Sequence, residues 1–573
     1  MDPILLEVLW NRMIGTVNEQ AAALMRTSFT SVVREAGDLS AGVFDRRGRM
    51  IAQAVTGTPG HINSMATCMR HFLEAFPLES LERGDVLVTN DPWKTASQLN
   101  DITVITPVFR SSGRGDRPVA FFGNTCHALD IGGRGLSADA REVFEEGLFI
   151  PLLKLYERGR PNEALLALLR ANVRTPEEVL GDLHAQVVGN EVGGQQLLAF
   201  LDEFGLEDIE ALSDVIVARS EAAMRERIRA LPDGAYPFEL ACDGFEEPVR
   251  LRVTVTVRGD GLVVDYAGTS PQVGHGINVA LNYTHAYTTY ALKCAISPDV
   301  PNNEGSFRPV TVTAPPGCIL NAQFPAAVAG RHLVGHFLPS AILGALAPAL
   351  PDRVMAPGFD GLWDTQIFGT DPRTGRHFTY VWFSAGGTGA LPTRDGLSAT
   401  AFPSGIAGVP AEVIEALSPV VLRRRELRRD SGGAGKFRGG LGQVMEVAVR
   451  TDRPFIFSGL YERIRFPAPG LMGGMPGAPG AVRTNMPGVT VRAKTRAVLP
   501  AGTEVTLELP GGGGYGPPWE RDPALVLEDV RNGYVSVERA RADYGVALEA
   551  ERLAVLPDET ARLRAALRAG AAG

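Results

Sequence analysis

Clustered glycine and proline residues are the feature that most constrains how this chain can fold. The sequence contains 65 glycines and 40 prolines, together about 18% of the chain against a usual level of roughly 12%. The clusters are not periodic, which argues against a collagen helix and against a flexible linker. They predict many tight turns and places where one backbone segment lies directly against another.

The length and overall composition indicate a large folded protein. At 573 residues the chain is too long for one hydrophobic core. Apolar residues make up 45% and charged residues 21% of the sequence, a balance typical of globular proteins rather than disordered ones. The net charge of −9 argues against nucleic acid as a partner.

The compartment is predicted from three further features. The chain begins with an acidic segment that lacks the basic start of a signal peptide. No apolar run reaches the roughly 18 residues of a membrane span. The five cysteines are far apart and form no CxxC pair, so we expect free thiols in the cytoplasm rather than disulfides or a thiolate zinc site.

Local patterns predict an α+β fold with mixed or antiparallel sheets, a helical insertion and a glycine-rich, β-rich C-terminal half. Apolar residues recur at helical spacing over 3–29, residues 62–76 are also expected to be helical, and strict alternation over 249–257 gives the clearest strand. The polar residues 110–118 are expected to form a loop between two strands. The expected regions are 1–158 (N-terminal α+β region), 159–232 (helical segment), 233–350 (central α+β region), 351–520 (glycine-rich, β-rich region) and 521–573 (C-terminal helical tail).

Carboxylates and one imidazole gather beside turns and short strands in the first quarter of the chain. Asp38 precedes a predicted strand, Asp101 begins another, and His127 follows a third. Side chains at adjacent strand ends can converge on one point, and Asp with His is a common ligand set for divalent metals. The alternative is that Asp91 caps a turn before Pro92 and Asp101 bonds local amides.

An ordered series of motifs resembles the hydantoinase B/oxoprolinase family over almost the whole chain, from residue 3 to residue 546. The motifs are Asp38-Leu39-Ser40-Ala41-Gly42-Val43-Phe44-Asp45, Asn90-Asp91-Pro92, Asp101, His127, Asp130-Ile131-Gly132-Gly133, Glu146-Gly147-Leu148-Phe149-Ile150-Pro151, Gly181-Asp182-Leu183-His184-Ala185-Gln186, Asn303-Glu304-Gly305-Ser306-Phe307-Arg308-Pro309, Gly432-Gly433-Ala434-Gly435-Lys436 and Pro510-Gly511-Gly512-Gly513-Gly514-Tyr515-Gly516.

The resemblance implies the catalytic subunit of an ATP-dependent hydrolase that acts on a small cyclic amide or imide. A HyuA-type ATPase subunit would bind ATP and phosphorylate the substrate's carbonyl oxygen, and the two would form a hetero-oligomer. This chain would complete the hydrolysis at a divalent metal, either Mn, Zn or Fe, which stabilises the developing oxyanion. Two alternatives stay open: the equivalent subunit of an ATP-dependent ketone (acetone- or acetophenone-type) carboxylase, and a non-catalytic scaffold with a degenerate metal site.

The resemblance also assigns roles to individual residues. The metal ligands fall on Asp38, Gln98, Asp101 and His127, and Gln98 stands where the family has a histidine. An amide oxygen is a weaker and harder donor than imidazole, so the site is retained with a changed preference, binds weakly, or is lost.

Two further residues, His61 and Glu146, are candidate catalytic groups for substrate contact or proton transfer. The alternatives are a packing role for His61 and a structural role for Glu146. Arg331 also matches a family position and could meet a phosphorylated intermediate or an acidic group at an interface, but a structural role is favoured.

The glycine strings do not match a phosphate-binding loop. Neither 432–436 nor 511–514 has the spacing G-x-x-x-x-G-K-[ST]. We expect close backbone packing, or closure around a substrate channel, at these positions.

Overall fold

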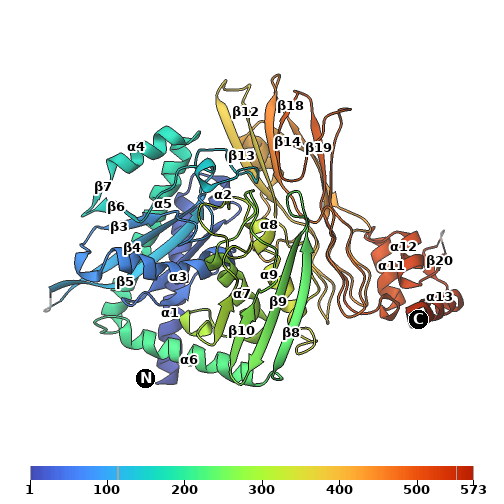
Figure 1. The fold of residues 1–573 in the computed structure, drawn as a ribbon, viewed down its shortest axis with the longest axis horizontal. Helices are drawn as coiled ribbons and strands as arrows, with labels where there is room; N and C mark the ends of the chain where they lie inside the picture. Colours follow the sequence, from blue (N-terminus) through green and yellow to red (C-terminus); the bar gives the residue numbers. More distant parts are fainter. Residues whose placement is uncertain (1, 113–114, 550–551, 572–573) are drawn as a thin grey trace.

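The computed structural model of the chain describes residues 2–112, 115–549 and 552–571. Within these ranges the strands form four large sheets and one two-stranded ribbon, with helices packed between and around them (Figure 1). Strand pairs are antiparallel in all four sheets, and β10 (Gly261–Asp265) also pairs in parallel with β11 (Val310–Thr313). The expected α+β fold with mixed and antiparallel sheets is therefore confirmed.

The largest sheet lies in the N-terminal region and has seven strands in the order β2-β1-β5-β4-β3-β6-β7. Its strands are β1 (Leu39–Phe44), β2 (Met50–Gln53), β3 (Val86–Thr89), β4 (Asp101–Ser112), β5 (Gly115–His127), β6 (Leu153–Glu157) and β7 (Arg160–Pro161). The helices of this half are α1 (Pro3–Thr27), α2 (Ser31–Arg34), α3 (Pro59–Ala75), α4 (Glu163–Asn172), α5 (Pro176–Glu203) and α6 (Glu210–Arg229).

Helices cover both faces of this sheet because its central strands are apolar on both sides. Val43 and Phe122 are register partners and pack in one core with α1, α5 and α6. Their neighbours Phe44 and Phe121 are also partners and point to the opposite face, where α3 packs. Side chains alternate along a strand, so a continuous apolar run serves two cores at once.

The prediction of a loop over 110–118 is wrong for the residues that the structure describes. β4 and β5 form one long hairpin in which Arg110 pairs with Arg117 and Ser111 with Asp116; residues 113 and 114 lie outside the described ranges. The polar side chains of this extension form ion pairs with other segments, such as Arg110 with Asp202. A polar run can therefore continue a strand, because backbone pairing does not require apolar side chains.

Three four-stranded sheets follow, and β20 (Leu548–Glu549) and β21 (Ala554–Val555) form the two-stranded ribbon. The three sheets comprise β8 (Gly234–Cys242), β9 (Val249–Arg258), β10 and β11; β12 (Trp363–Thr370), β13 (His377–Ser384), β16 (Phe455–Leu460) and β18 (Arg496–Leu499); and β14 (Val420–Leu427), β15 (Gln443–Val449), β17 (Ala481–Thr484) and β19 (Glu504–Glu508). The helices here are α7 (Leu281–Ile296), α8 (His332–Gly335), α9 (Leu338–Leu346), α10 (Ala411–Leu417), α11 (Pro523–Arg531), α12 (Val537–Tyr544) and α13 (Pro557–Ala571).

One large core joins these three sheets. The predicted strand β9 alternates between buried and more exposed residues, and its buried face packs with α7 and α9. The last helices form a small separate core around Val526 and Tyr544 at the right-hand end of Figure 1. The predicted C-terminal tail helix runs to Ala571, and residues 572 and 573 lie outside the described ranges. The five-region division stays a prediction.

The glycine strings pack backbone against backbone, as predicted. Gly433 donates its N–H to the carbonyl of Gly512 at 2.9 Å, and Gly512 donates to Gly440 at 3.0 Å. A side chain at Gly512 would place its Cβ 1.9 Å from the carbonyl oxygen of Thr388. No room is left for a phosphate beside these amides.

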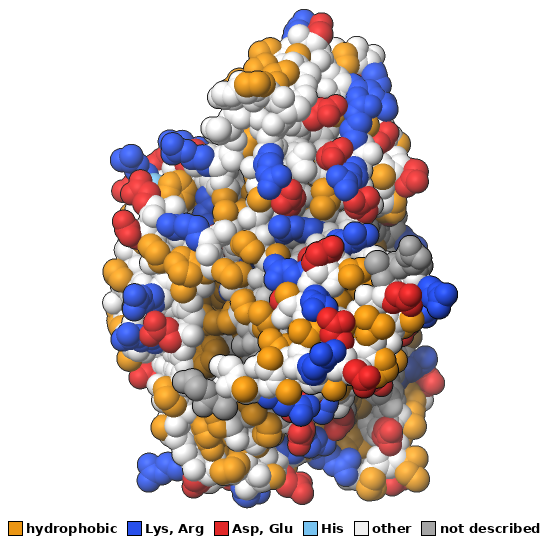
Figure 2. All heavy atoms as spheres, turned by 90° about the vertical axis from the view of Figure 1, so that its right-hand side faces the viewer, with side chains coloured by type: hydrophobic (Ala, Val, Ile, Leu, Met, Phe, Trp, Pro, Cys, Tyr) orange, Lys and Arg blue, Asp and Glu red, His pale blue; other side chains and the backbone are white. Residues whose placement is uncertain are grey.

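The surface is mixed in charge. Acidic and basic side chains are interspersed over the face shown in Figure 2, with no broad patch of one sign. In the ranges given above, none of the helices has both the length and the apolar character that crossing a bilayer requires.

Candidate functional site

Three neighbouring strands bring Asp38, Asp101 and His127 together, as predicted from the positions of these residues at strand ends. Asp101 begins β4 and is the register partner of His127, the last residue of β5. Asp38 directly precedes β1 on the other side of β5, and its carbonyl accepts the N–H of His127 at 3.2 Å. All three side chains are buried, because the helices of the second half cover this end of the sheet.

Asp101 is the centre of a buried hydrogen-bonded cluster. Its Oδ1 lies 3.0 Å from Nδ1 of His127, and its Oδ2 lies 3.1 Å from Nε2 of His61 and accepts a hydrogen bond from Arg331. Burial acts to raise the pKa of Asp101, but the charges of Arg331 and His61 outweigh it and hold the pKa well below its usual range. Asp101 is therefore a permanent carboxylate.

Helix α3 starts three residues before the expected start at residue 62, and its first turn therefore contains His61. Proline suits the first position of a helix, and α3 begins at Pro59 with Thr58 preceding it. Thr58 donates its hydroxyl to Oδ1 of Asp38 at 3.1 Å. His61, in the first turn, lies 3.7 Å from the same carboxylate. The helix start thus joins Asp38 to Asp101 through one imidazole.

A second set of buried ionisable groups faces this cluster. Nε2 of His332 in α8 lies 3.2 Å from Oδ2 of Asp364 in β12. Burial lowers the pKa of His332 and raises that of Asp364, so it favours the neutral form of each. Burial also lowers the pKa of His336 to about 3. One sequence feature could have indicated this set: His332 and His336 stand four residues apart, which is the spacing of neighbours on one face of a helix.

The two sets enclose a small cavity, here called the Asp–His cavity. Its volume of about 20 Å³ is enough for one water molecule or ion. Arg331 closes one side, with its guanidinium 4.6 Å from the ring centre of Tyr283. The lining residues are Asp38, Thr58, His61, His127, Tyr283, Arg331, His332, His336, Leu362, Asp364, Phe383, Ser404 and Ile406.

The donor atoms fit a divalent metal in type and in burial. Nε2 of His127 and both amide atoms of Gln98 are buried and have no hydrogen-bond partner, which is costly unless a ligand pairs with them. Over the described ranges, no group of three or more His, Cys, Asp or Glu side chains is arranged around a common point to hold an ion. The imidazoles and carboxylates bond to one another instead.

Glu146 lies outside the Asp–His cavity. Its Oε1 accepts the N–H groups of Val328 and Ala329 at 2.6 and 2.7 Å, while Oε2 is buried without a partner. These contacts fix the segment that leads into Arg331 and support a positioning role; a catalytic role for Glu146 stays a prediction. Burial raises its pKa to about 8.

The raised pKa of Glu146 predicts a pH-dependent stability. Between its ordinary pKa of 4.5 and about 8, the folded chain holds a proton that the unfolded chain has lost, so stability falls as pH rises through this window. Glu146→Gln cannot ionise and still offers an oxygen to both amides. We expect it to raise the free energy of unfolding at pH 8.5 by about 4–5 kcal/mol and leave it unchanged at pH 4.

Denaturant unfolding of the variant and the parent from pH 4 to pH 9 measures this effect. Glu145→Gln is the matched control, because that neighbouring side chain is 32% exposed and pairs with Arg134. Parallel pH profiles for Glu146→Gln and the parent would contradict the assignment.

Asp91 and Asp130, the other two carboxylates of the motif region, serve local structure. Asp91 accepts the N–H of Trp93 and pairs with Lys94, as the turn-capping alternative predicted. Asp130 accepts the N–H of Gly132 and pairs with Arg174 at 2.7 Å. Neither lines the Asp–His cavity.

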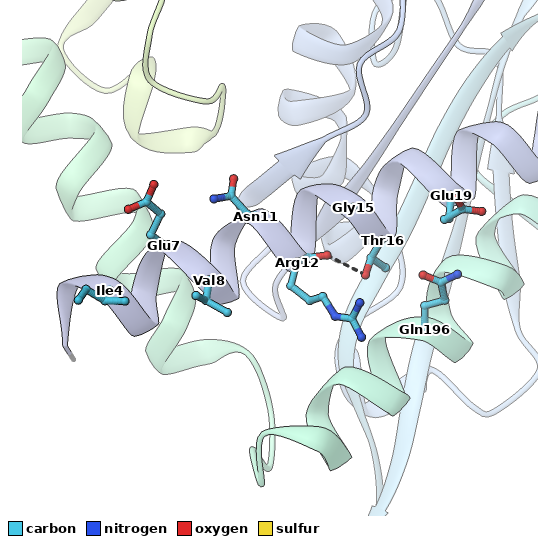
Figure 3. A pocket seen from close by; sticks show the side chains of 9 residues that line it. All are labelled: Ile4, Glu7, Val8, Asn11, Arg12, Gly15, Thr16, Glu19 and Gln196. Carbon is cyan, nitrogen blue, oxygen red and sulfur yellow. Dashed lines mark hydrogen bonds between the residues drawn. The ribbon is translucent and has the colours of Figure 1, made fainter.

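The hollow beside the N-terminal helix is a surface feature. It has a volume of about 710 Å³ and lies along α1, between exposed side chains such as Ile4, Val8 and Arg12 (Figure 3). None of its lining residues belongs to the Asp–His cavity. Its ionisable groups face solvent, so it has no feature of a catalytic site.

Comparisons with known proteins identify one family over nearly the whole length of the chain. The profile of the hydantoinase B/oxoprolinase family matches residues 2–518. The chain is 32% identical to the caprolactamase beta subunit of Pseudomonas jessenii, covering 96% of this chain and 97% of that one. It is 30% identical to the B-type subunit of a putative D-/L-hydantoinase from a Pseudomonas strain, with 96% and 95% covered.

Two solved structures have the same fold as this chain. The ATP-dependent caprolactamase from Pseudomonas jessenii superposes with a TM-score of 0.89 at 30% identity, covering 99% of this chain and 100% of that one. A nucleotide-free acetone carboxylase gives the same TM-score at 20% identity, with 99% and 83% covered, a likeness that shows the fold alone.

The fold and the cavity together define a large α+β protein with a buried aspartate–histidine centre between two sheets. The chain belongs to the hydantoinase B/oxoprolinase family.

Proposed function

We propose that this chain is the hydantoinase B-type catalytic subunit of an ATP-dependent hydrolase of cyclic amides or imides. The observation that carries the proposal is the buried cluster around Asp101, in a chain similar over its whole length to one component of a caprolactamase and one of a putative hydantoinase. Relatives with oxoprolinase names extend the same class, although this chain matches only 42% of the length of the 5-oxoprolinase of Pestalotiopsis fici.

A partner protein is part of the proposal. A HyuA-type ATPase partner binds ATP and transfers its phosphoryl group to the carbonyl oxygen of the substrate, and the two chains form a hetero-oligomer. The packed glycine strings support this division, because they offer no phosphate cradle on this chain. A cytoplasmic location is consistent with five cysteines that are free in the described chain.

The cavity residues have complementary roles in ring opening. His127 bonds to Asp101 through Nδ1, which fixes the ring and leaves its unpaired Nε2 free to bind a ligand. His61, whose Nδ1 has no hydrogen-bond partner, takes a proton from the attacking water. His61, on the other oxygen of Asp101, holds the carboxylate in place and relays protons toward Asp38. Asp364, whose pKa is raised by burial beside His332, donates a proton to the departing amide nitrogen.

A divalent metal, Mn, Zn or Fe, is part of the same proposal. Asp38, Gln98, Asp101 and His127 would hold it. When bound, it supplies Lewis-acid polarisation of the carbonyl and lowers the pKa of a water molecule. Gln98 is the ligand position to test, because its buried amide has no hydrogen-bond partner in the protein.

Gln98→His is expected to strengthen binding of Zn²⁺ or Mn²⁺ by about 10- to 100-fold, since imidazole is a better donor for these ions than an amide oxygen. Isothermal titration calorimetry and the metal content after dialysis measure the change. Gln98→Leu, which keeps the volume and removes the donor, is the control and should bind more weakly than the parent. Weaker binding in Gln98→His would mean that residue 98 is not a ligand.

The function is tested by reconstitution. The chain is co-expressed with the HyuA-type partner and supplied with ATP and hydantoin, 5-oxoproline or ε-caprolactam. The expected result is ATP-dependent formation of the ring-opened acid, detected by mass spectrometry. Incorporation of labelled bicarbonate into acetone without any ring opening would overturn the proposal in favour of a carboxylase, and no turnover with a metal-loaded complex would favour a scaffold.

A further inference from the structure

Three aromatic side chains from distant parts of the sequence form an exposed patch on the surface. Phe144 is 63% exposed and Phe324 is 57% exposed. Their ring centres lie 5.5 Å apart, edge to face, and the ring of Phe324 also lies 5.3 Å from that of the partly exposed Trp93. We call these three residues the aromatic patch. Single exposed apolar residues are common, whereas adjoining exposed rings are typical of a surface that another molecule covers.

Hydrogen bonds between three segments hold the aromatic patch in place. Val143 is fully buried and donates its N–H to the carbonyl of Pro325 at 2.9 Å, which sets the two phenylalanines side by side. The indole N–H of Trp93 donates to the carbonyl of Ala322 at 2.9 Å. The rings are therefore positioned before any other molecule arrives, so little conformational entropy is lost when they are covered.

The segments that carry the aromatic patch also carry residues of the site. One segment leads from the indole ring to Asp101, the second reaches Glu146 two residues after its phenylalanine, and the third leads to Arg331. Arg331 bonds to Asp101, and Glu146 accepts the backbone N–H groups of residues 328 and 329. A molecule on the patch therefore lies against the segments that position the Asp101 cluster.

The residues around the aromatic patch carry both signs of charge. Arg141 and Glu142 are exposed beside Phe144 and form no ion pair within the described ranges, and Glu145 pairs with Arg134. An apolar centre with a charged, solvent-accessible rim is the usual anatomy of a protein–protein interface. The two glutamates argue against an anionic membrane surface as the covering partner.

The division of labour in the proposed function indicates which protein covers the aromatic patch. The packed glycine strings leave this chain without a phosphate cradle, so the activated substrate forms on the ATPase partner and has to cross to the Asp–His cavity. That cavity, of about 20 Å³, holds no more than one water molecule or ion. Entry therefore depends on the segments around it, and a partner that delivers the substrate has to contact them. The aromatic patch is an exposed apolar surface on these segments.

We propose that the aromatic patch is a docking site for the ATPase partner, with Phe144 and Phe324 as the central anchors of the interface. The complementary surface on the partner is an apolar groove rimmed by charges of both signs. This rests on the proposed function, which supplies the partner, and it adds where on this chain the partner sits. Aromatic side chains at the centre of an interface contribute most of the binding energy.

Phe144→Ala and Phe324→Ala are each expected to weaken binding of the HyuA-type partner to the full chain by at least about 10-fold. Isothermal titration calorimetry without substrate or ATP measures the affinity. Both rings are more than half exposed, so the variants should fold as the parent does, and thermal unfolding checks this. Leu525→Ala is the control, at a 44% exposed side chain of α11 in the separate C-terminal core, and should leave the affinity unchanged.

Unchanged partner affinity in both folded variants would overturn the docking site. So would sedimentation showing that the chain alone is a dimer which both variants convert to a monomer without loss of partner binding, because the aromatic patch then joins two copies of this chain. Ring-dependent binding in a complex that opens no cyclic amide would reject the proposed function and leave the docking site standing. A parent chain that binds no ATPase partner would reject both.

Discussion

Asp101→Asn is expected to lower ATP-dependent ring opening by about 10³-fold in the reconstituted complex. The carboxylate binds His61, His127 and Arg331 at once, so the amide removes the negative charge that stabilises an imidazolium and leaves the guanidinium uncompensated. Breaking one partner of a buried ion pair also costs about 3–5 kcal/mol of stability. Turnover and thermal unfolding are measured on the same preparation.

Asp130→Asn is the control that separates the loss of turnover from the loss of stability. Asp130 is also fully buried and paired with an arginine, Arg174 at 2.7 Å, but its hydrogen bonds go to Gly132 and Arg174 rather than to the histidines of the site. We expect a similar loss of stability with turnover within a few-fold of the parent. Equal turnover losses in the two variants would show that Asp101 acts through the fold and not through the chemistry.

Gly387→Ala is expected to prevent stable folding. The added Cβ would lie 1.8 Å from the carbonyl oxygen of Gly440 and 2.8 Å from the backbone nitrogen of Gly512, and neither backbone can move without breaking the glycine layer. The cost exceeds the roughly 4–5 kcal/mol that marks exceptional substitutions. The yield of folded protein and its unfolding temperature measure it.

Gly15→Ala is the matched control, because Gly15 is exposed in the middle of α1 and a Cβ there meets nothing within 4 Å. We expect a gain of up to about 1 kcal/mol from helix propensity. A folded Gly387→Ala of parental stability would mean that the glycine layer tolerates side chains.

Much of the site could be predicted because it is built on strand ends. Asp38, Asp101 and His127 each stand next to a short apolar run, and pairing of β1, β5 and β4 was enough to bring them together. The start of α3 was expected three residues too late, although Pro59 signals it, and this shift is what puts His61 in the first turn against Asp101.

The opposite wall could not be predicted in the same way. His332 and Asp364 lie on different elements, α8 and β12, and are more than two hundred residues from Asp101. Arg331, for which the sequence favours a structural role over contact with a phosphorylated intermediate or an interface acid, bonds to Asp101.

The sequence by itself determined the α+β fold, the ordered motifs, the close packing of the glycine strings and the three residues at neighbouring strand ends. These depend on local periodicity, side-chain size and short-range pairing, which the order of residues encodes directly. The tertiary structure alone decided which distant side chains close the Asp–His cavity and which carboxylates stay charged. Those properties depend on burial and on contacts between remote segments, and burial is what turns an ordinary Asp, His or Asn into a group with a specific chemical role.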